Sequence, residues 1–280
     1  MPVEMALKFF AHYIQRELGI VYAEHNYFQL QNRLEEIAKA LGIASIEALH
    51  REASTGIHGA MKQLLLDLAT NNETSFFRDP RVFAALDTIL TKGLDSNLWG
   101  VGGLRLWSAA SSSGQEALSL AMQLTEMGDR RGAPLNFSIV GTDISDRILT
   151  RARSFTYSQL EIQRGLSAPR MERFFTKDAS GGWSAVKDIG RHITYQKLNL
   201  KEAFNFPRGF HVILCRNVLI YQSVEGKTEI LKRISATMEP SGYLILGAGE
   251  SLIGLSHDFE QEFVDGTVMY RKKAAAGRAA

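Results

Sequence analysis

Three loops of the sequence carry side chains suited to holding a polar ligand, and each loop follows a short apolar run typical of a buried strand. The first loop, residues 108–114, consists almost entirely of very small residues, which let a ligand approach the backbone closely. The second loop carries Asp143, and the third carries Arg216 and Asn217. A carboxylate directly after a strand commonly accepts hydrogen bonds from ribose hydroxyl groups. Glu116, shortly after the first loop, is a further candidate for a polar contact.

The small-residue loop also indicates the kind of ligand. Gly114 is its only glycine after Gly103, so the loop does not match the GxGxxG pattern of dinucleotide sites. No Gly-Lys-Ser/Thr follows, as a phosphate-binding P-loop would require. The pattern therefore disfavours nicotinamide cofactors and nucleoside triphosphates. It favours a nucleoside without a pyrophosphate, and S-adenosylmethionine is the obvious candidate.

Simpler interpretations of the same residues remain open. Residues 111–113 also suit an ordinary turn between a strand and a helix. Asp143 could act only as the cap of a helix that begins near Ser145. Asn72 and Thr74, in a polar segment further upstream, could be local turn residues and nothing more.

The composition bounds the class of protein. The chain has 280 residues, 45% of them hydrophobic, which suits about two domains, and its net charge is +2. A charge so near neutral lacks the basic excess of a nucleic-acid binder. The single cysteine, Cys215, excludes an intramolecular disulfide framework, and the seven histidines show no metal-ligand spacing, so we expect no metal. Since no apolar run could span a bilayer and the start lacks a signal-peptide pattern, we expect a cytoplasmic protein.

The elements that must position these loops follow two patterns. The first seventy residues show helical periodicity, which predicts a small helical bundle. From about residue 103, strand-like and helical segments alternate, which predicts a mostly parallel sheet, and a turn at Asp265-Gly266 adds an antiparallel edge. Residues 154–200 fit the alternation poorly, and we interpret them as a small inserted β-subdomain. The expected divisions are a helical domain (1–70), a linker and helix (71–93), which the family resemblance given below implies to be cofactor-contacting, the α/β domain (94–273) and a frayed tail (274–280).

Four segments together resemble one family, the CheR-type chemotaxis receptor methyltransferases. The matching blocks are Asn72-Glu-Thr-Ser-Phe-Phe-Arg-Asp79, Leu106-Trp-Ser-Ala-Ala-Ser-Ser-Ser-Gly-Gln-Glu116, Gly141-Thr-Asp-Ile144 and Cys215-Arg-Asn-Val-Leu-Ile-Tyr221. Their order and spacing match as well, and the resemblance covers nearly the whole chain. It implies an α/β, Rossmann-like methyltransferase fold preceded by an all-α domain. It also implies transfer of a methyl group from S-adenosylmethionine to glutamate carboxylates on the cytoplasmic helices of chemoreceptors, with S-adenosylhomocysteine as the product.

The resemblance further implies roles for individual residues. The residues implied to hold the cofactor are Asn72, Thr74, Arg78, Glu116, Asp143, Asn199, Leu200, Arg216 and Asn217. Arg105 and Tyr221 are implied to lie nearest the transferred methyl group, as the catalytic residues. A glutamate with a pKa of about 4.3 is ionised at neutral pH, so the reaction needs alignment and no general base. We therefore expect Arg105 to orient the acceptor carboxylate and Tyr221 to help fix the geometry.

The chain departs from the family pattern in two places. After Gly114 many relatives have two glutamates and then Pro-Tyr, whereas this chain has Gln115-Glu116-Ala117-Leu118, so only Glu116 is carried over. In some members the β-subdomain docks a short tethering pentapeptide at the receptor's carboxyl terminus. The region 178–189 is shorter here than in those members, and we expect weak tether binding or none. We expect a monomer.

Charge in the helical domain bears on how a receptor would be contacted. Residues 1–70 hold six basic and eight acidic side chains, so the domain is net negative. Contact with an acidic receptor helix must then depend on local patches, such as a face carrying Arg33 and Lys39.

Two functions of other classes remain as alternatives. One is a methyltransferase acting on nucleic acid or a small molecule, but Cys215-Arg-Asn-Val218 is unlike the Asn/Asp-Pro-Pro-Tyr/Phe motif of base amino methylation. The near-neutral charge also disfavours strong phosphate binding. The other alternative is a non-catalytic cofactor-sensing or scaffold module, against which the presence of both Arg105 and Tyr221 argues.

Overall fold

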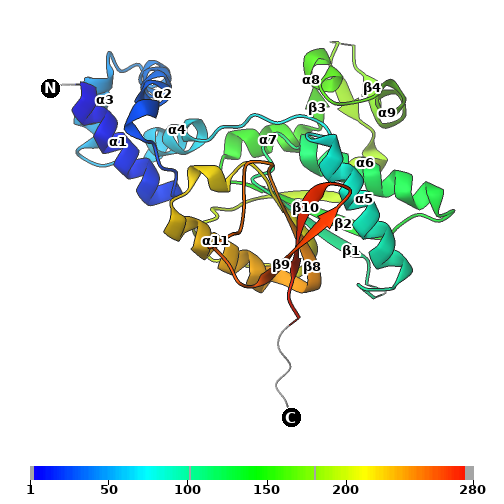
Figure 1. Ribbon diagram of the computed structural model, residues 1–280. Helices are drawn as coiled ribbons and strands as arrows, with labels where there is room; N and C mark the ends of the chain where they lie inside the picture. Colours follow the sequence, from blue (N-terminus) through cyan, green and yellow to red (C-terminus); the bar gives the residue numbers. More distant parts are fainter. Residues whose placement is uncertain (1–2, 101, 180, 275–280) are drawn as a thin grey trace.

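The structure is a computed structural model that describes residues 3–100, 102–179 and 181–274 (Figure 1). A helical region at one end of the molecule adjoins an α/β region built around a large sheet. The expected frayed tail at 274–280 lies, apart from Ala274, outside the described residues. Within the described ranges, no helix is both long enough and apolar enough to cross a membrane.

The N-terminal helices form a bundle around a core of their own. Their bounds are Val3–Leu18 (α1), Tyr27–Ala40 (α2), Ile46–Ala53 (α3) and Gly59–Ala69 (α4), with a 3-10 turn at Glu24–Asn26 (η1). Apolar residues recur at helical spacing, so side chains such as Phe10, Leu34 and Leu49 meet in one buried cluster. The Ser45 side chain caps α3 by accepting a hydrogen bond from the N–H of Ala48 at 3.2 Å.

A seven-stranded sheet forms the centre of the α/β region, in the order β6-β2-β1-β7-β8-β10-β9. The strands are Leu104–Ala109 (β1), Phe137–Asp143 (β2), Ile193–Lys197 (β6), Phe210–Cys215 (β7), Met238–Leu246 (β8), Phe259–Val264 (β9) and Thr267–Lys272 (β10). Within the sheet, the adjacent strands β6, β2, β1, β7 and β8 all pair in parallel. Strand β10 pairs antiparallel with both β8 and β9. The β9–β10 turn has positive φ at Asp265 (48°) and Gly266 (74°). The predicted parallel sheet with an antiparallel edge is confirmed.

Helices cover both faces of this sheet. The main ones are Pro80–Asp95 (α5), Gln115–Arg130 (α6), Asp146–Ser154 (α7) and Val224–Thr237 (α11). Successive side chains of a strand point to opposite faces. On β7, Val212 and Leu214 therefore join the core beneath α5 and α6, whereas Ile213 joins the core beneath α11.

The insertion forms a second, small sheet in the order β3-β5-β4. Its elements are Thr156–Tyr157 (β3), Gln159–Gln163 (α8), Ala168–Phe174 (α9), Phe175–Lys177 (β4), Trp183–Ala185 (β5) and Lys187–Gly190 (α10). Phe76 packs edge-on against Tyr157 and Phe175, with ring centroids 5.0 and 5.5 Å apart, and ties this sheet to the linker. The strand β6 lies within the expected range of the insertion but joins the large sheet, where Ile193 pairs with Ile139 of β2.

Candidate functional site

A pocket lies where the carboxyl ends of β1, β2 and β7 face the N-terminal helices. Ten of the eleven site residues named from the sequence line it: Asn72, Thr74, Arg78, Glu116, Asp143, Asn199, Leu200, Arg216, Asn217 and Tyr221. They come from the linker, from loops that follow strands, and from the start of α6. Folding therefore brings together residues that the sequence keeps far apart, at the edge where parallel sheets bind ligands.

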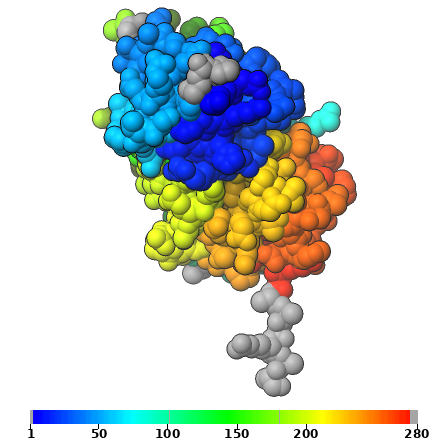
Figure 2. Space-filling model, turned by 90° about the vertical axis from the view of Figure 1, so that its left-hand side faces the viewer, coloured from blue at the N-terminus to red at the C-terminus, as the bar shows by residue number. Residues whose placement is uncertain are grey.

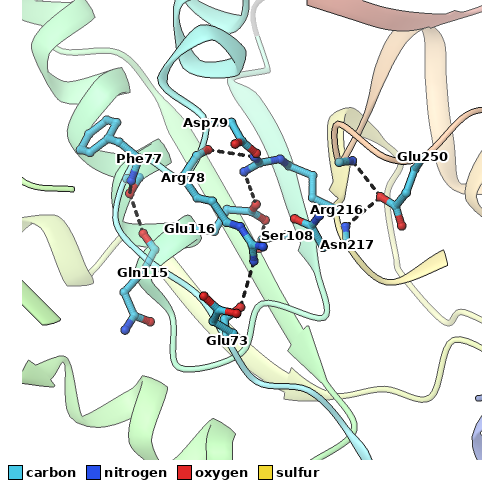
Figure 3. A network of polar contacts seen from close by, with 12 residues as sticks. Glu73, Phe77, Arg78, Asp79, Ser108, Gln115, Glu116, Arg216, Asn217 and Glu250 are labelled. Atoms are coloured by element: carbon cyan, nitrogen blue, oxygen red, sulfur yellow. Dashed lines mark hydrogen bonds and ion pairs between the residues drawn. The ribbon is translucent and has the colours of Figure 1, made fainter. Parts of the chain in front are cut away.

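Two buried phenylalanines anchor the linker segment 70–79. The N–H of Phe77 donates to Oγ of Ser119 at 2.9 Å, and the two aromatic rings of the segment are 1% and 5% exposed. This leaves the polar residues on either side at the pocket wall. Nη1 of Arg78 donates to the carbonyl oxygen of Glu73 at 3.0 Å (Figure 3).

Arg216 is the centre of a buried ion-pair network (Figure 3). Its side chain is 2% exposed, and its Nη1 lies 3.0 Å from Oε2 of Glu116. Its Nη2 pairs with the carboxylate of Asp79 and donates to the carbonyl oxygen of Arg78 at 2.8 Å. Oε1 of Glu116 accepts a hydrogen bond from Ser108 at 2.7 Å. The network joins the end of β7 to the start of α6 and to the linker.

Asp143 is held from two sides by backbone groups. It is 5% exposed, and its two carboxylate oxygens accept hydrogen bonds from the N–H groups of Ser112 and Ser145, each at 3.1 Å. Burial raises the pKa of Asp143 above its usual value. The cap of α7 is Ser145, whose Oγ accepts from the N–H of Ile148 at 3.1 Å. Asp143 is therefore not needed as the cap of that helix.

Tyr221 lies at the seam between the two regions, in the 3-10 turn Leu219–Tyr221 (η2). Its hydroxyl group accepts a hydrogen bond from Nδ2 of Asn71 at 3.2 Å, and its carbonyl oxygen accepts from the N–H of Val21 at 2.8 Å. Nearby, Nε2 of Gln222 donates to the carbonyl oxygen of Leu18 at 3.1 Å. Figure 2 shows the N-terminal helices lying directly against the segments near residues 200–230.

The structure corrects the expected place of Arg105, which does not line the pocket. Arg105 is the second residue of β1 and lies near its amino end, whereas the pocket lies at the carboxyl end. Its guanidinium group donates to the carbonyl oxygens of Gly209 at 2.9 Å and Arg208 at 3.0 Å and packs on the ring of Phe210. These contacts join β1 to the residues before β7, at the end of the sheet opposite the pocket.

The sequence reasoning overlooked Glu250, which follows β8. Its carboxylate accepts hydrogen bonds from the N–H groups of Asn217, Val218, Ile220 and Gly247. A usable signal was present: β8 is parallel to β7, so a polar residue soon after β8 lies beside the loop after β7.

The pocket suits a polar ligand such as a nucleoside. Three buried polar atoms that belong to lining residues have no hydrogen-bond partner in the described part of the chain: Oγ of Ser111, Nε of Arg216 and Oε1 of Gln222. A ligand with donors and acceptors would satisfy such atoms. Within the described residues, no group of three or more His, Cys, Asp or Glu side chains is arranged to hold a metal ion. Burial raises the pKa of the Cys215 thiol, which fits a packing residue and not a nucleophile.

Comparisons with known proteins agree on one family. Residues 72–268 match the family model described as "CheR methyltransferase, SAM binding domain". Chemotaxis protein methyltransferase 1 of Vibrio cholerae is 36% identical, over 94% of this chain and 95% of that protein. Chemotaxis protein methyltransferase 1 of Pseudomonas aeruginosa is 35% identical, over 93% of this chain and 95% of that protein.

Solved structures similar to this chain include other methyltransferases. The magnesium protoporphyrin IX methyltransferase of Synechocystis, with bound S-adenosylmethionine, is 14% identical with a TM-score of 0.37, over 73% of this chain and 87% of that one. The glycopeptide N-methyltransferase MtfA, also complexed with S-adenosylmethionine, is 14% identical with a TM-score of 0.35, over 74% of this chain and 72% of that one.

Proposed function

The chain belongs to the CheR methyltransferase family, and we infer that it methylates glutamate side chains of chemoreceptors with S-adenosylmethionine as the methyl donor. The observation that carries this inference is that ten of the eleven site residues named from the sequence line one pocket. That pocket lies at the carboxyl ends of parallel strands. For the cofactor we propose that Asp143 accepts hydrogen bonds from the ribose hydroxyl groups. The other pocket residues named for the cofactor, apart from Arg78, would hold its remaining polar parts.

The reaction requires alignment more than proton transfer. When bound, S-adenosylmethionine supplies a methyl group on a positively charged sulfur. The acceptor glutamate would take this methyl group on a carboxylate oxygen, and the electron pair of the broken carbon–sulfur bond would stay on sulfur. A glutamate with a pKa of about 4.3 has already lost its proton at neutral pH, so no base is needed. The protein's contribution is to align the groups and exclude water.

We propose that Arg78 takes the role first expected of Arg105. Two arginines line the pocket, Arg78 and Arg216. Arg216 is 2% exposed and is already paired with two carboxylates, so its charge is neutralised. Arg78 is half-buried, and its Nη1 contacts only the carbonyl oxygen of Glu73 among the described hydrogen bonds. A guanidinium group in that position can bind an incoming carboxylate, with the Tyr221 hydroxyl group on the facing loop fixing the geometry.

Methyl transfer to receptor-containing membranes tests the function directly. With tritiated S-adenosylmethionine, we expect incorporation into the receptor that base releases as volatile methanol, because a carboxyl methyl ester hydrolyses in base. Incorporation that resists base would indicate N-methylation. Binding of S-adenosylhomocysteine without any transfer would indicate a cofactor-sensing module. Boiled enzyme and membranes lacking the receptor are the controls.

The remaining partner assignments are also proposals. We propose that the protein acts as a monomer in the cytoplasm, where the acceptor helices lie. We further propose that a receptor's carboxyl-terminal pentapeptide binds weakly or not at all. In support, β4 ends at Lys177 and β5 begins as early as Trp183, and the N–H of Asp178 donates to the carbonyl oxygen of Gly182 at 2.8 Å. Calorimetry that gave a Kd of about 1 µM or tighter for such a peptide would refute the last proposal.

A further inference from the structure

The carboxylate of Glu250 gathers four backbone N–H groups from two loops, and Figure 3 shows it beside Asn217. Its Oε2 lies 2.8 Å from the nitrogen of Asn217 and 2.8 Å from that of Gly247. Its Oε1 lies 2.9 Å from the nitrogen of Val218 and 3.2 Å from that of Ile220. An ionised carboxylate offers about four acceptor positions and no donor, so it matches this set of donors.

The backbone beside Glu250 is built for this contact. Asn217 has φ of 58°, so the chain turns sharply just after β7 and directs several N–H groups to one side. A Cβ on Gly247 would lie 2.9 Å from the nitrogen of Asn217 and 2.9 Å from Oε2 of Glu250. Only glycine lets the loop after β8 come this close to the loop after β7.

Glu250 holds the middle of a segment whose two ends are fixed by other contacts. At one end, Arg216 is held by the carboxylates of Glu116 and Asp79. At the other end, the carbonyl oxygen of Tyr221 accepts from the N–H of Val21. The residues between them include Asn217, which lines the pocket, and they lead directly into Tyr221.

We propose that Glu250 is a positioning residue for methyl transfer. It holds the backbone of residues 217–220 in the one shape that directs the side chains of Asn217 and Tyr221 into the pocket. This inference rests on the proposed function, because it takes Tyr221 to act in that reaction. Glu250 itself does not line the pocket and acts through the loop.

Glu250→Gln is the sharpest perturbation, because it keeps the volume of the side chain. The amide presents one acceptor oxygen, and its NH2 group opposes N–H donors of the loop. We expect kcat to fall by about 10- to 100-fold, as small misplacements do in catalytic sites. We expect the Kd for S-adenosylhomocysteine to rise by no more than about threefold, because Asn217 is one of several residues named for the cofactor, and Asp143 and the linker residues are untouched. Glu250→Asp, which retains the carboxylate, should recover part of the lost kcat.

A double-mutant cycle with Tyr221→Phe distinguishes positioning from general loosening of the fold. If Glu250 acts through Tyr221, Glu250→Gln should lower kcat much less in the Tyr221→Phe background than in the wild type. Glu260→Gln, the same change at an exposed site of β9, is the matched control and should leave kcat unchanged.

The outcomes separate this proposal from the proposed function. An inactive wild type with normal S-adenosylhomocysteine binding would refute the proposed function alone. An active wild type with kcat of Glu250→Gln within about twofold, or with equal losses in both backgrounds, would refute the role of Glu250. If Glu250→Gln lowers Tm so far that it is unfolded in the assay, Glu250→Asp decides. A folded Glu250→Asp that loses kcat equally in the wild-type and Tyr221→Phe backgrounds would then overturn the proposal, and a smaller loss in the Tyr221→Phe background would support it.

Discussion

Replacing Asp143 with asparagine separates its contribution to ligand binding from its contribution to folding. Each oxygen of the buried carboxylate accepts one backbone N–H, from Ser112 and from Ser145, at 3.1 Å. Asp143→Asn keeps one acceptor oxygen and replaces the other by an NH2 donor. The ribose of the cofactor would lose a hydrogen bond to a charged group, while the pocket would keep its shape.

The expected magnitudes differ for the two properties. A hydrogen bond to a charged group contributes about 1.5–3 kcal/mol, which corresponds to about 10- to 100-fold in Kd. For folding, one N–H left without an acceptor costs about 1–3 kcal/mol. The Asp143 side chain is only 5% exposed, so removing its charge stabilises the folded state and offsets part of this cost. We therefore expect a large loss of affinity for S-adenosylhomocysteine and a small change in the free energy of unfolding.

Calorimetry with S-adenosylhomocysteine and urea unfolding of the same samples measure both quantities. Asp188→Asn is the matched control, because the Asp188 side chain is 90% exposed and lies outside the pocket. A Kd for Asp143→Asn within about threefold of wild type would refute the contact with the ribose. A large loss of stability with normal affinity would assign Asp143 to the fold alone.

The pH dependence of Asp143 has a defined sign. Burial raises its pKa above the usual 3.8, so the folded state holds the proton more tightly than the unfolded state. The resulting stabilisation is fully present below the unfolded pKa and is lost as pH rises through the folded pKa. Relative to Asp143→Asn, the wild type should therefore gain stability as pH falls through that pKa. Its affinity for S-adenosylhomocysteine should fall over the same range, and a flat affinity in the wild type would contradict a requirement for the ionised form.

Three other substitutions test the pocket. Tyr221→Phe should lower kcat by about tenfold or more while the Kd for S-adenosylhomocysteine stays near wild type; an equal loss in both would contradict a role in alignment. Arg78→Ala should remove most methyl transfer in the radiolabel assay and Arg105→Ala should retain it, whereas the reverse ranking would restore Arg105 as the orienting residue. Glu116→Ala should destabilise the protein by about 3 kcal/mol in urea unfolding, since it removes a carboxylate from the buried Arg216; a loss below about 1 kcal/mol would show that the second carboxylate suffices.

The sequence predicted the architecture because its signals are local. Helical spacing in the first seventy residues, strand runs of buried type and the Asp265-Gly266 turn each specify one element, and the rule of parallel crossovers specifies the sheet. The same rule explains why ten of the residues named from the sequence line one pocket. Residues directly after strands, such as Asp143 and Arg216, must meet at one edge of a parallel sheet.

The positions and partners of side chains that make tertiary contacts could not be predicted from local sequence patterns. Arg105 lies in the strand that leads to the small-residue loop, but it is the second residue of that strand and so lies at the end away from the pocket. Arg33 was considered for a basic patch, yet its Nη1 donates to the carbonyl oxygen of Leu68 at 2.8 Å and to that of Ala69, so it caps the end of α4. Glu250 also accepts from Asn217, 33 positions away, a contact that the parallel pairing of β7 with β8 indicates but no local pattern does.

The order of the strands along the chain affects how the protein folds while the ribosome synthesises it. The N-terminal helices can close their core once residue 69 has emerged, since the buried members of that core lie within residues 6–69. The large sheet must wait, because its central strand β7 pairs with β1 but is made long after it. The pocket waits longer than the pairing of β1 with β7, since its lining runs to Gln222, which bridges to Ile20 across the seam. A nascent chain that stops short of β7 has a folded N-terminal bundle, an unpaired edge on β1 and no complete site for a cofactor.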